Sequence, residues 1–158
     1  VWDICAAAVL AVDGAICGLG ARDTLRTEMG YPLHGHELSL EISPVQASAT
    51  WAIGWKKGPF HGSDVLVAQK SDGPARRMRG LKSNDRGIPR AGMELQDGFG
   101  KSVGIVTSGT FSPTLRMGIA LALVDTRLSI GDQVSIDIRG RASTATIVEF
   151  PFVQSHVR

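Results

Sequence analysis

The chain has 158 residues, of which 43% are hydrophobic and 20% charged, as is typical of a globular domain. Its 17 basic and 15 acidic residues give a net charge of +2, too balanced for a protein that binds nucleic acid through a basic face. The longest apolar runs, Ile4–Val12 and Ile119–Val124, are far shorter than the roughly 20 residues of a membrane-spanning helix. We therefore expect neither nucleic acid nor a membrane as a partner.

The first part of the chain is predicted to be helical. Val1–Val12 is rich in alanine and has no capping residue before it, so we expect the natural protein to extend further upstream. A second helix is predicted over Ala21–Met29. There Ala21, Leu25 and Met29 recur every four residues, which predicts a narrow buried stripe.

The next segment carries a helix-start signal and a strand pattern. Ser43-Pro44-Val45-Gln46 has a capping serine, a proline at the first helical position and a glutamine able to complete a capping box. A short helix or turn should follow, and the alternation in Trp51–Trp55 predicts a strand. Another helix is predicted over Val65–Lys70. Gly73-Pro74 then marks the best candidate for a domain boundary.

Beyond this boundary the sequence predicts only short strands separated by turns such as Asp97-Gly98 and Gly131-Asp132. The six expected strands are Arg76–Lys82, Met93–Gln96, Ser102–Thr107, Met117–Val124, Gln133–Arg139 and Thr144–Phe150. Closely spaced antiparallel strands of this kind favour a small closed barrel. The fold class is therefore α+β, with helices first and a six-stranded antiparallel barrel last.

Neither the cysteines nor the histidines form a convincing metal pattern. Cys5 and Cys17 lack a second pair and zinc-like spacing, so we interpret them as reduced, buried thiols of a cytosolic protein. His34 and His36 alternate next to Glu37, but no third well-spaced ligand follows. We expect a polar loop here and no metal.

Several blocks of the sequence resemble those of one enzyme family. GLGARDTLRTEMG is followed directly by YPLHGHEL, and SPVQASATWAI, GIPRAG, TSGTFSPTL and PFV come later in the same order. These blocks occupy Gly18–Gly30, Tyr31–Leu38, Ser43–Ile53, Gly87–Gly92, Thr107–Leu115 and Pro151–Val153. Together they resemble the T-protein of the glycine cleavage system, an aminomethyltransferase, over nearly the whole chain.

The resemblance implies a domain organisation and a reaction. Residues 1–75 would be the C-terminal remainder of a folate-binding core, and residues 76–158 the C-terminal β-barrel domain. The family transfers a methylene unit from the aminomethyl-dihydrolipoyl H-protein to tetrahydrofolate and releases ammonia. It implies a cytoplasmic enzyme, or one of the mitochondrial matrix in a eukaryote. The family's catalytic aspartate lies in the N-terminal half, so we assign no catalytic residue and expect this chain alone to be inactive.

The resemblance also implies folate-binding residues. Arg22 stands at the arginine of the family's ARD motif, where a planar guanidinium can bind a pterin edge or a carboxylate with two parallel hydrogen bonds. The alternative for Arg22 is a surface ion pair with Asp23 or Glu28. Tyr31 and Trp51 are candidates for stacking on the folate rings, and for both the alternative is ordinary packing.

Two further features have a functional and a structural interpretation. Thr107–Pro113 is expected to be a loop that faces the folate opening or, alternatively, a tight connection whose hydroxyls satisfy backbone groups. A basic cluster could attract polyglutamylated folate or the lipoylated H-protein, or be a solvated strand face. Its members are Arg76, Arg77, Arg79, Lys82, Arg86 and Arg90.

Two other functions belong to the same superfamily. One is the folate-binding module of a dimethylglycine- or sarcosine-type oxidase, which normally follows a flavin domain. The other is a non-catalytic folate-binding barrel of the kind that assists iron–sulfur assembly. Those proteins usually carry a Lys-Gly-Cys signature, and neither Cys5 nor Cys17 lies in such a motif.

Overall fold

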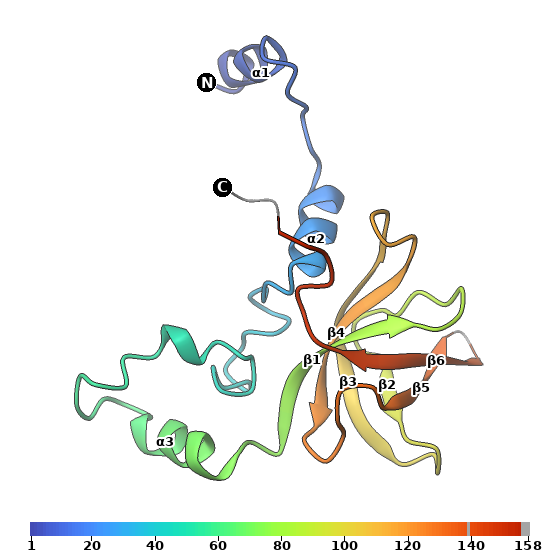
Figure 1. Cartoon of the computed structure of the whole chain (residues 1–158). Helices are drawn as coiled ribbons and strands as arrows, with labels where there is room; N and C mark the ends of the chain where they lie inside the picture. The colour runs from blue at the N-terminus through green and yellow to red at the C-terminus, as the bar shows by residue number, and fades with distance from the viewer. Residues whose placement is uncertain (139, 156–158) are drawn as a thin grey trace.

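The computed structural model describes residues 1–138 and 140–155 and consists of a barrel with helices before it (Figure 1). The helical elements are α1 (Trp2–Leu10), α2 (Leu19–Glu28), the 3₁₀ turn η1 (Thr50–Ala52) and α3 (Ser63–Asp72). The strands are β1 (Arg76–Ser83), β2 (Glu94–Gln96), β3 (Ser102–Ser112), β4 (Met117–Asp125), β5 (Gln133–Ile138) and β6 (Arg141–Val148). Arg139, the last residue of one predicted strand, lies outside the described residues.

The six strands form one closed antiparallel barrel in the order β1-β4-β3-β2-β5-β6. This confirms the predicted fold class. Closure removes the exposed sheet edges that would otherwise invite pairing with another chain. No helix among the described residues has both the length and the apolar character needed to cross a membrane.

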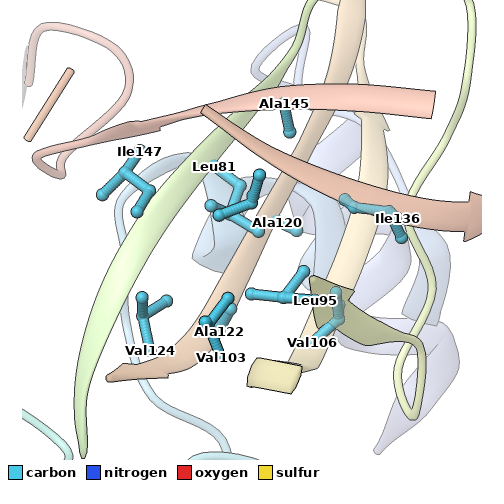
Figure 2. Close-up of a cluster of buried hydrophobic side chains, with 11 residues drawn as sticks. Leu81, Leu95, Val103, Val106, Ala120, Ala122, Val124, Ile136, Ala145 and Ile147 are labelled. Carbon is cyan, nitrogen blue, oxygen red and sulfur yellow. The ribbon is translucent and has the colours of Figure 1, made fainter. Parts of the chain in front are cut away.

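Apolar side chains fill the barrel, as Figure 2 shows. The interior cluster consists of Leu81, Leu95, Val103, Val106, Ala120, Ala122, Val124, Val134, Ile136, Ala145 and Ile147. A second cluster joins Met78, Ile119 and Leu121 to Phe152, which follows the last strand. Strand β4 contributes to both clusters, which explains its unbroken apolar run: both of its faces are buried.

Helix α2 packs on the barrel, where it contacts β3 and β4. Figure 1 shows α1 and the segment with α3 projecting away from the barrel. Helix α2 ends in two backbone bonds typical of a Schellman motif, from Gly30 N to Thr27 O and from Tyr31 N to Arg26 O, and Gly30 has a φ of +70°. This cap fixes where the chain leaves the helix, immediately before Tyr31.

Several local predictions are wrong. The expected buried stripe on α2 is exposed at Ala21 and Leu25, and the helix buries Thr27 and Glu28 instead. The physical reason is that α2 packs against a face of β3 that bears hydroxyl groups, and these form hydrogen bonds with polar side chains of the helix. Cys5 and Cys17, expected to be buried, are both exposed.

Two predicted backbone conformations also differ. Trp51–Trp55 is not a strand: its start belongs to η1, and its backbone bonds stay local, from Ala52 N to Ala49 O and from Ile53 N to Thr50 O. An alternating pattern needs a neighbouring strand to pair with, and none lies there within the described residues. Conversely, Thr107–Ser112 is not a loop but part of β3, paired with β4 after a register shift between Val106 and Ser108. The capping box at Ser43 and Gln46 does form, around a turn.

Candidate functional site

A groove of about 390 Å³ follows the exposed side of α2. It is lined by Cys17, Gly18, Arg22, Leu25, Arg26, Met29 and Tyr31. Leu25 and Tyr31 are more than half exposed, at 59% and 56%. Leu25 and Met29, two of the three side chains predicted to form a core stripe, therefore line this groove. An apolar floor with a few polar groups at its margin is the usual character of a site for a small organic ligand.

Arg22 enters this groove with its guanidinium unengaged. Its side chain is exposed and takes part in none of the hydrogen bonds or ion pairs formed among residues 1–138 and 140–155. The two carboxylates considered as its surface partners are occupied elsewhere: Asp23 pairs with Arg26, and Glu28 accepts bonds from barrel hydroxyls. Arg22 thus retains its full set of donors for a ligand.

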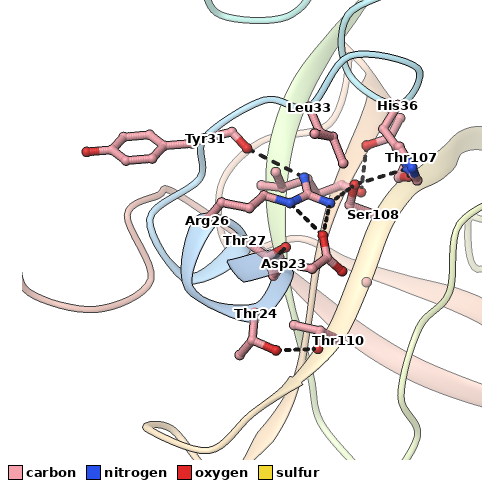
Figure 3. A network of polar contacts seen from close by, with 12 residues as sticks. Asp23, Thr24, Arg26, Thr27, Tyr31, Leu33, His36, Thr107, Ser108 and Thr110 are labelled. Carbon is pink, nitrogen blue, oxygen red and sulfur yellow. Dashed lines mark hydrogen bonds and ion pairs between the residues drawn. The ribbon is translucent and has the colours of Figure 1, made fainter. Parts of the chain in front are cut away.

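Arg26, one helical turn further on, is in the opposite situation (Figure 3). Its side chain is 9% exposed. Its Nε and Nη2 atoms both donate to Asp23 Oδ1, Nη2 also to Ser108 Oγ, and Nη1 to Glu37 Oε2 and the Tyr31 carbonyl. A guanidinium has five N–H donors, and these contacts use all of them. Sequence analysis did not single out Arg26; the only signal was its i, i+3 spacing from Asp23.

The hydroxyls of the TSGTFSPTL motif bind α2. Ser108, Thr110 and Ser112 alternate along β3 and so share one face of the strand. Their partners lie on α2: Arg26 donates to Ser108 Oγ at 2.8 Å, Thr24 and Thr110 hydroxyls lie 3.3 Å apart, and Ser112 donates to Glu28 Oε1 at 2.5 Å. We call this row of three β3 residues the hydroxyl strip.

The strip holds a buried carboxylate. Glu28 is 3% exposed, and its second oxygen accepts a bond from the Thr114 hydroxyl at 3.2 Å. The Glu28 backbone carbonyl also accepts a bond from Phe152 N. Sequence analysis considered Glu28 only as a surface partner of Arg22, so its role in the barrel contact was missed. The regular spacing of the hydroxyls was the available signal.

Tyr31 and Trp51 line a second hollow of about 360 Å³, together with Met29, Met78 and Phe150 among others. Trp51 is 85% exposed. Because Tyr31 also lines the groove on α2, the structure brings Arg22 together with Tyr31, and Tyr31 together with Trp51. It does not bring Arg22 and Trp51 into one hollow.

Of the two histidines, His36 is engaged in a contact with the barrel. His36 Nδ1 lies 2.8 Å from the Thr107 carbonyl, and Glu37 accepts bonds from Arg26 and from Leu33 N. In the part of the chain that is described, no three His, Cys, Asp or Glu side chains gather as a metal site would require.

The basic cluster is divided between the two ends of β1. Arg76, Arg77 and Arg79 belong to the first half of the strand, whereas Arg86 and Arg90 come after its end. Arg86 lines a third hollow of about 610 Å³ with Asp85 and Arg141. Hydrogen bonds from the Ser143 hydroxyl and the Gly87 and Thr144 amides lower the pKa of Asp85. The members of the cluster are thus spread along β1 and the segment that follows it.

Comparison with known proteins agrees with this architecture. Residues 76–154 match the model of the glycine cleavage T-protein C-terminal barrel domain, and residues 1–57 match that of the GCVT N-terminal domain. The chain belongs to the glycine cleavage T-protein family. The family match accounts for both the barrel and the helical segment that contains α2.

Relatives and a solved structure extend this match. The chain is 57% identical to aminomethyltransferases of Parafrankia sp. and Mycobacterium avium, over 99% and 100% of its length, and 54% identical to that of Mycobacterium tuberculosis. It spans 43% of the length of each of these relatives. The crystal structure of glycine cleavage system aminomethyltransferase T from Bartonella henselae superimposes on 86% of the chain and 39% of that protein, with a TM-score of 0.81 and 35% identity.

Proposed function

We propose that this T-protein family chain provides part of the folate site of an aminomethyltransferase of the glycine cleavage system. In this reaction, a methylene unit passes from the aminomethyl-dihydrolipoyl H-protein to tetrahydrofolate, and ammonia is released. Residues 1–75 would belong to the folate-binding domain and the barrel to the C-terminal domain. The relatives' shared name, aminomethyltransferase, favours this function over an oxidase module.

The observation that carries the proposal is the unengaged guanidinium of Arg22 beside an apolar groove. Tyr31, which is about half exposed, also lines the groove. A flat heteroaromatic ring with polar edges fits such a groove, since its faces meet apolar carbon and its edge can accept bonds from Arg22. Tyr31 supplies an aromatic face, and Trp51 a further one in the adjoining hollow.

The chemistry assigned to this chain is binding and orientation. Holding tetrahydrofolate in one pose lowers the barrier for attack by its nitrogen on the transferred carbon, because orientation is established before the reaction. None of the residues in the groove is assigned as the acid or base of the reaction. The lipoylated H-protein is the proposed donor partner of the whole enzyme.

Calorimetric titration with tetrahydrofolate tests the proposal. We expect Arg22→Ala to raise the Kd at least tenfold, which is about 1.4 kcal/mol. Arg22→Lys should recover little of this loss, because an ammonium cannot form the bidentate contact. Arg141→Ala is the matched control, an exposed arginine at another hollow. Equal Kd values for the wild-type chain and Arg22→Ala would refute the assignment.

A further inference from the structure

We propose that Arg26 is a positioning residue for the folate site: it fixes the segment that carries Tyr31 and ties that segment to Ser108 of the barrel. This inference deepens the proposed function and rests on it. Arg26 lines the same groove as Arg22 and Tyr31. Because all five of its donors are used within the protein, it has none left for a ligand. Its contribution must therefore be made through other residues.

Arg26 holds the segment after α2 at several points. The Tyr31 amide donates to the Arg26 carbonyl at 2.8 Å, and the Tyr31 carbonyl accepts a longer contact from Arg26 Nη1 at 3.5 Å. The stronger link runs through Glu37, whose Oε2 accepts from Arg26 Nη1 and from the Leu33 amide, both at 3.0 Å. These bonds close residues 31–37 into a loop whose two ends are bound to one guanidinium.

The same guanidinium connects this loop to the barrel. Ser108 accepts its bond at 2.8 Å, and Thr107 accepts the contact of His36, a member of the loop. Glu37 is 1% exposed, and its Oε1 atom has no hydrogen-bond partner among the described residues. The charge of Glu37 is thus compensated by Arg26 alone within the described chain. This gives the loop a strong preference for one position, because leaving it would separate a buried ion pair.

The test uses a property of the sequence: Tyr31 is the only tyrosine. Replacing it with 3-fluorotyrosine gives one ¹⁹F resonance that reports on this ring alone. Arg26→Gln would leave the Glu37 charge buried and unpaired, and could unfold the loop for that reason alone. The main variant is therefore the double substitution Arg26→Gln with Glu37→Gln, which removes both charges. Arg26→Lys is the conservative variant, and Arg127→Gln is the control because it removes an exposed arginine whose guanidinium donates to Asp125, away from the groove.

We expect the double variant to shift or broaden the Tyr31 resonance and to raise the tetrahydrofolate Kd at least fivefold, with the cooperative unfolding of the barrel retained. Arg26→Lys should restore part of both effects, because it keeps the charge next to Glu37 but loses the planar fork that reaches Asp23 and Ser108 together. Arg127→Gln should change neither measurement. An unchanged Kd overturns the inference, whether or not the resonance moves.

A weaker affinity with an unmoved resonance also overturns it, because Arg26 would then act on the ligand by another route. If Arg22→Ala weakens binding and the Arg26 variants do not, this inference fails and the proposed function stands. If the wild-type chain does not bind tetrahydrofolate, both fail.

Discussion

Replacing Ser112 by alanine tests how firmly the hydroxyl strip holds α2 on the barrel. The Ser112 hydroxyl donates to Glu28 Oε1 and accepts a bond from the Leu115 amide at 3.0 Å. Ser112 is 0% exposed and Glu28 3%, so water cannot replace either partner without rearrangement. After the substitution, the buried carboxylate keeps a single side-chain donor, Thr114 at 3.2 Å.

The expected loss of unfolding free energy follows from these contacts. A hydrogen bond to a charged group contributes about 1.5–3 kcal/mol, and a neutral one about 1 kcal/mol. Ser112→Ala should therefore cost about 2.5–4 kcal/mol. Thr110→Ala on the same face of β3 should cost only about 0.5–1 kcal/mol, because its contact with Thr24 is neutral and 3.3 Å long. If the charge of Glu28 causes the difference, Ser112→Ala should cost about 1 kcal/mol less in a Glu28→Gln background.

Urea unfolding measures these costs, provided that the m value is unchanged, so that a shift of the midpoint reports stability. Amide hydrogen exchange along α2 supplies a local measurement, because the helix should open more often once its anchor is weakened. Equal costs for Ser112→Ala and Thr110→Ala, or a cost for Ser112→Ala below about 0.5 kcal/mol, would refute the view that the strip anchors α2 through a buried carboxylate.

Three further substitutions test contributions to the stability of the barrel. Gly109→Ala should cost about 1–3 kcal/mol in urea unfolding, because its Cβ would lie 2.2 Å from the Pro89 carbonyl oxygen; no loss would contradict this close approach. Leu81→Ala, at a core position that is 0% exposed, should cost about 2–5 kcal/mol and lower the Tm without changing m. The lowered pKa of Asp85 stabilises the fold above its unfolded value of about 3.9, and this contribution is lost as pH falls through the folded pKa. The stability difference between the wild-type chain and Asp85→Asn should therefore be constant above about pH 5 and shrink below about pH 4; a pH-independent difference would contradict it.

The barrel was predictable from the sequence because its strands carry local signals. Alternating or continuous apolar runs bounded by turn dipeptides located all six strands to within a few residues at most of their ends. What local signals cannot supply is the partner of a segment. Trp51–Trp55 has a strand pattern but no strand beside it among the described residues, and it folds into a local turn. Thr107–Ser112 has the composition of a loop but a partner in β4, and it remains a strand.

The same limitation explains the errors on α2. A stripe of Ala21, Leu25 and Met29 predicts burial only if the facing surface is apolar. The surface that faces α2 in this structure is the hydroxyl strip, so the helix buries Thr27 and directs Glu28 to Ser112 of the strip. Leu25 and Met29 of the apolar stripe line the groove instead. The spacing was interpreted correctly as one face of a helix, but its neighbour is determined by contacts more than 80 residues away in sequence.

Arg22 and Arg26 show why the roles of two similar residues required the structure. They lie one turn apart on α2 and line one groove, so sequence spacing gives no reason to distinguish them. The acceptors distinguish them: Asp23, Glu37 and Ser108 all surround Arg26, and none contacts the side chain of Arg22. An arginine whose donors are satisfied internally stabilises a conformation, whereas one with free donors in a groove is available to a ligand. The proposed roles, ligand binding for Arg22 and positioning for Arg26, follow from that difference in hydrogen bonding.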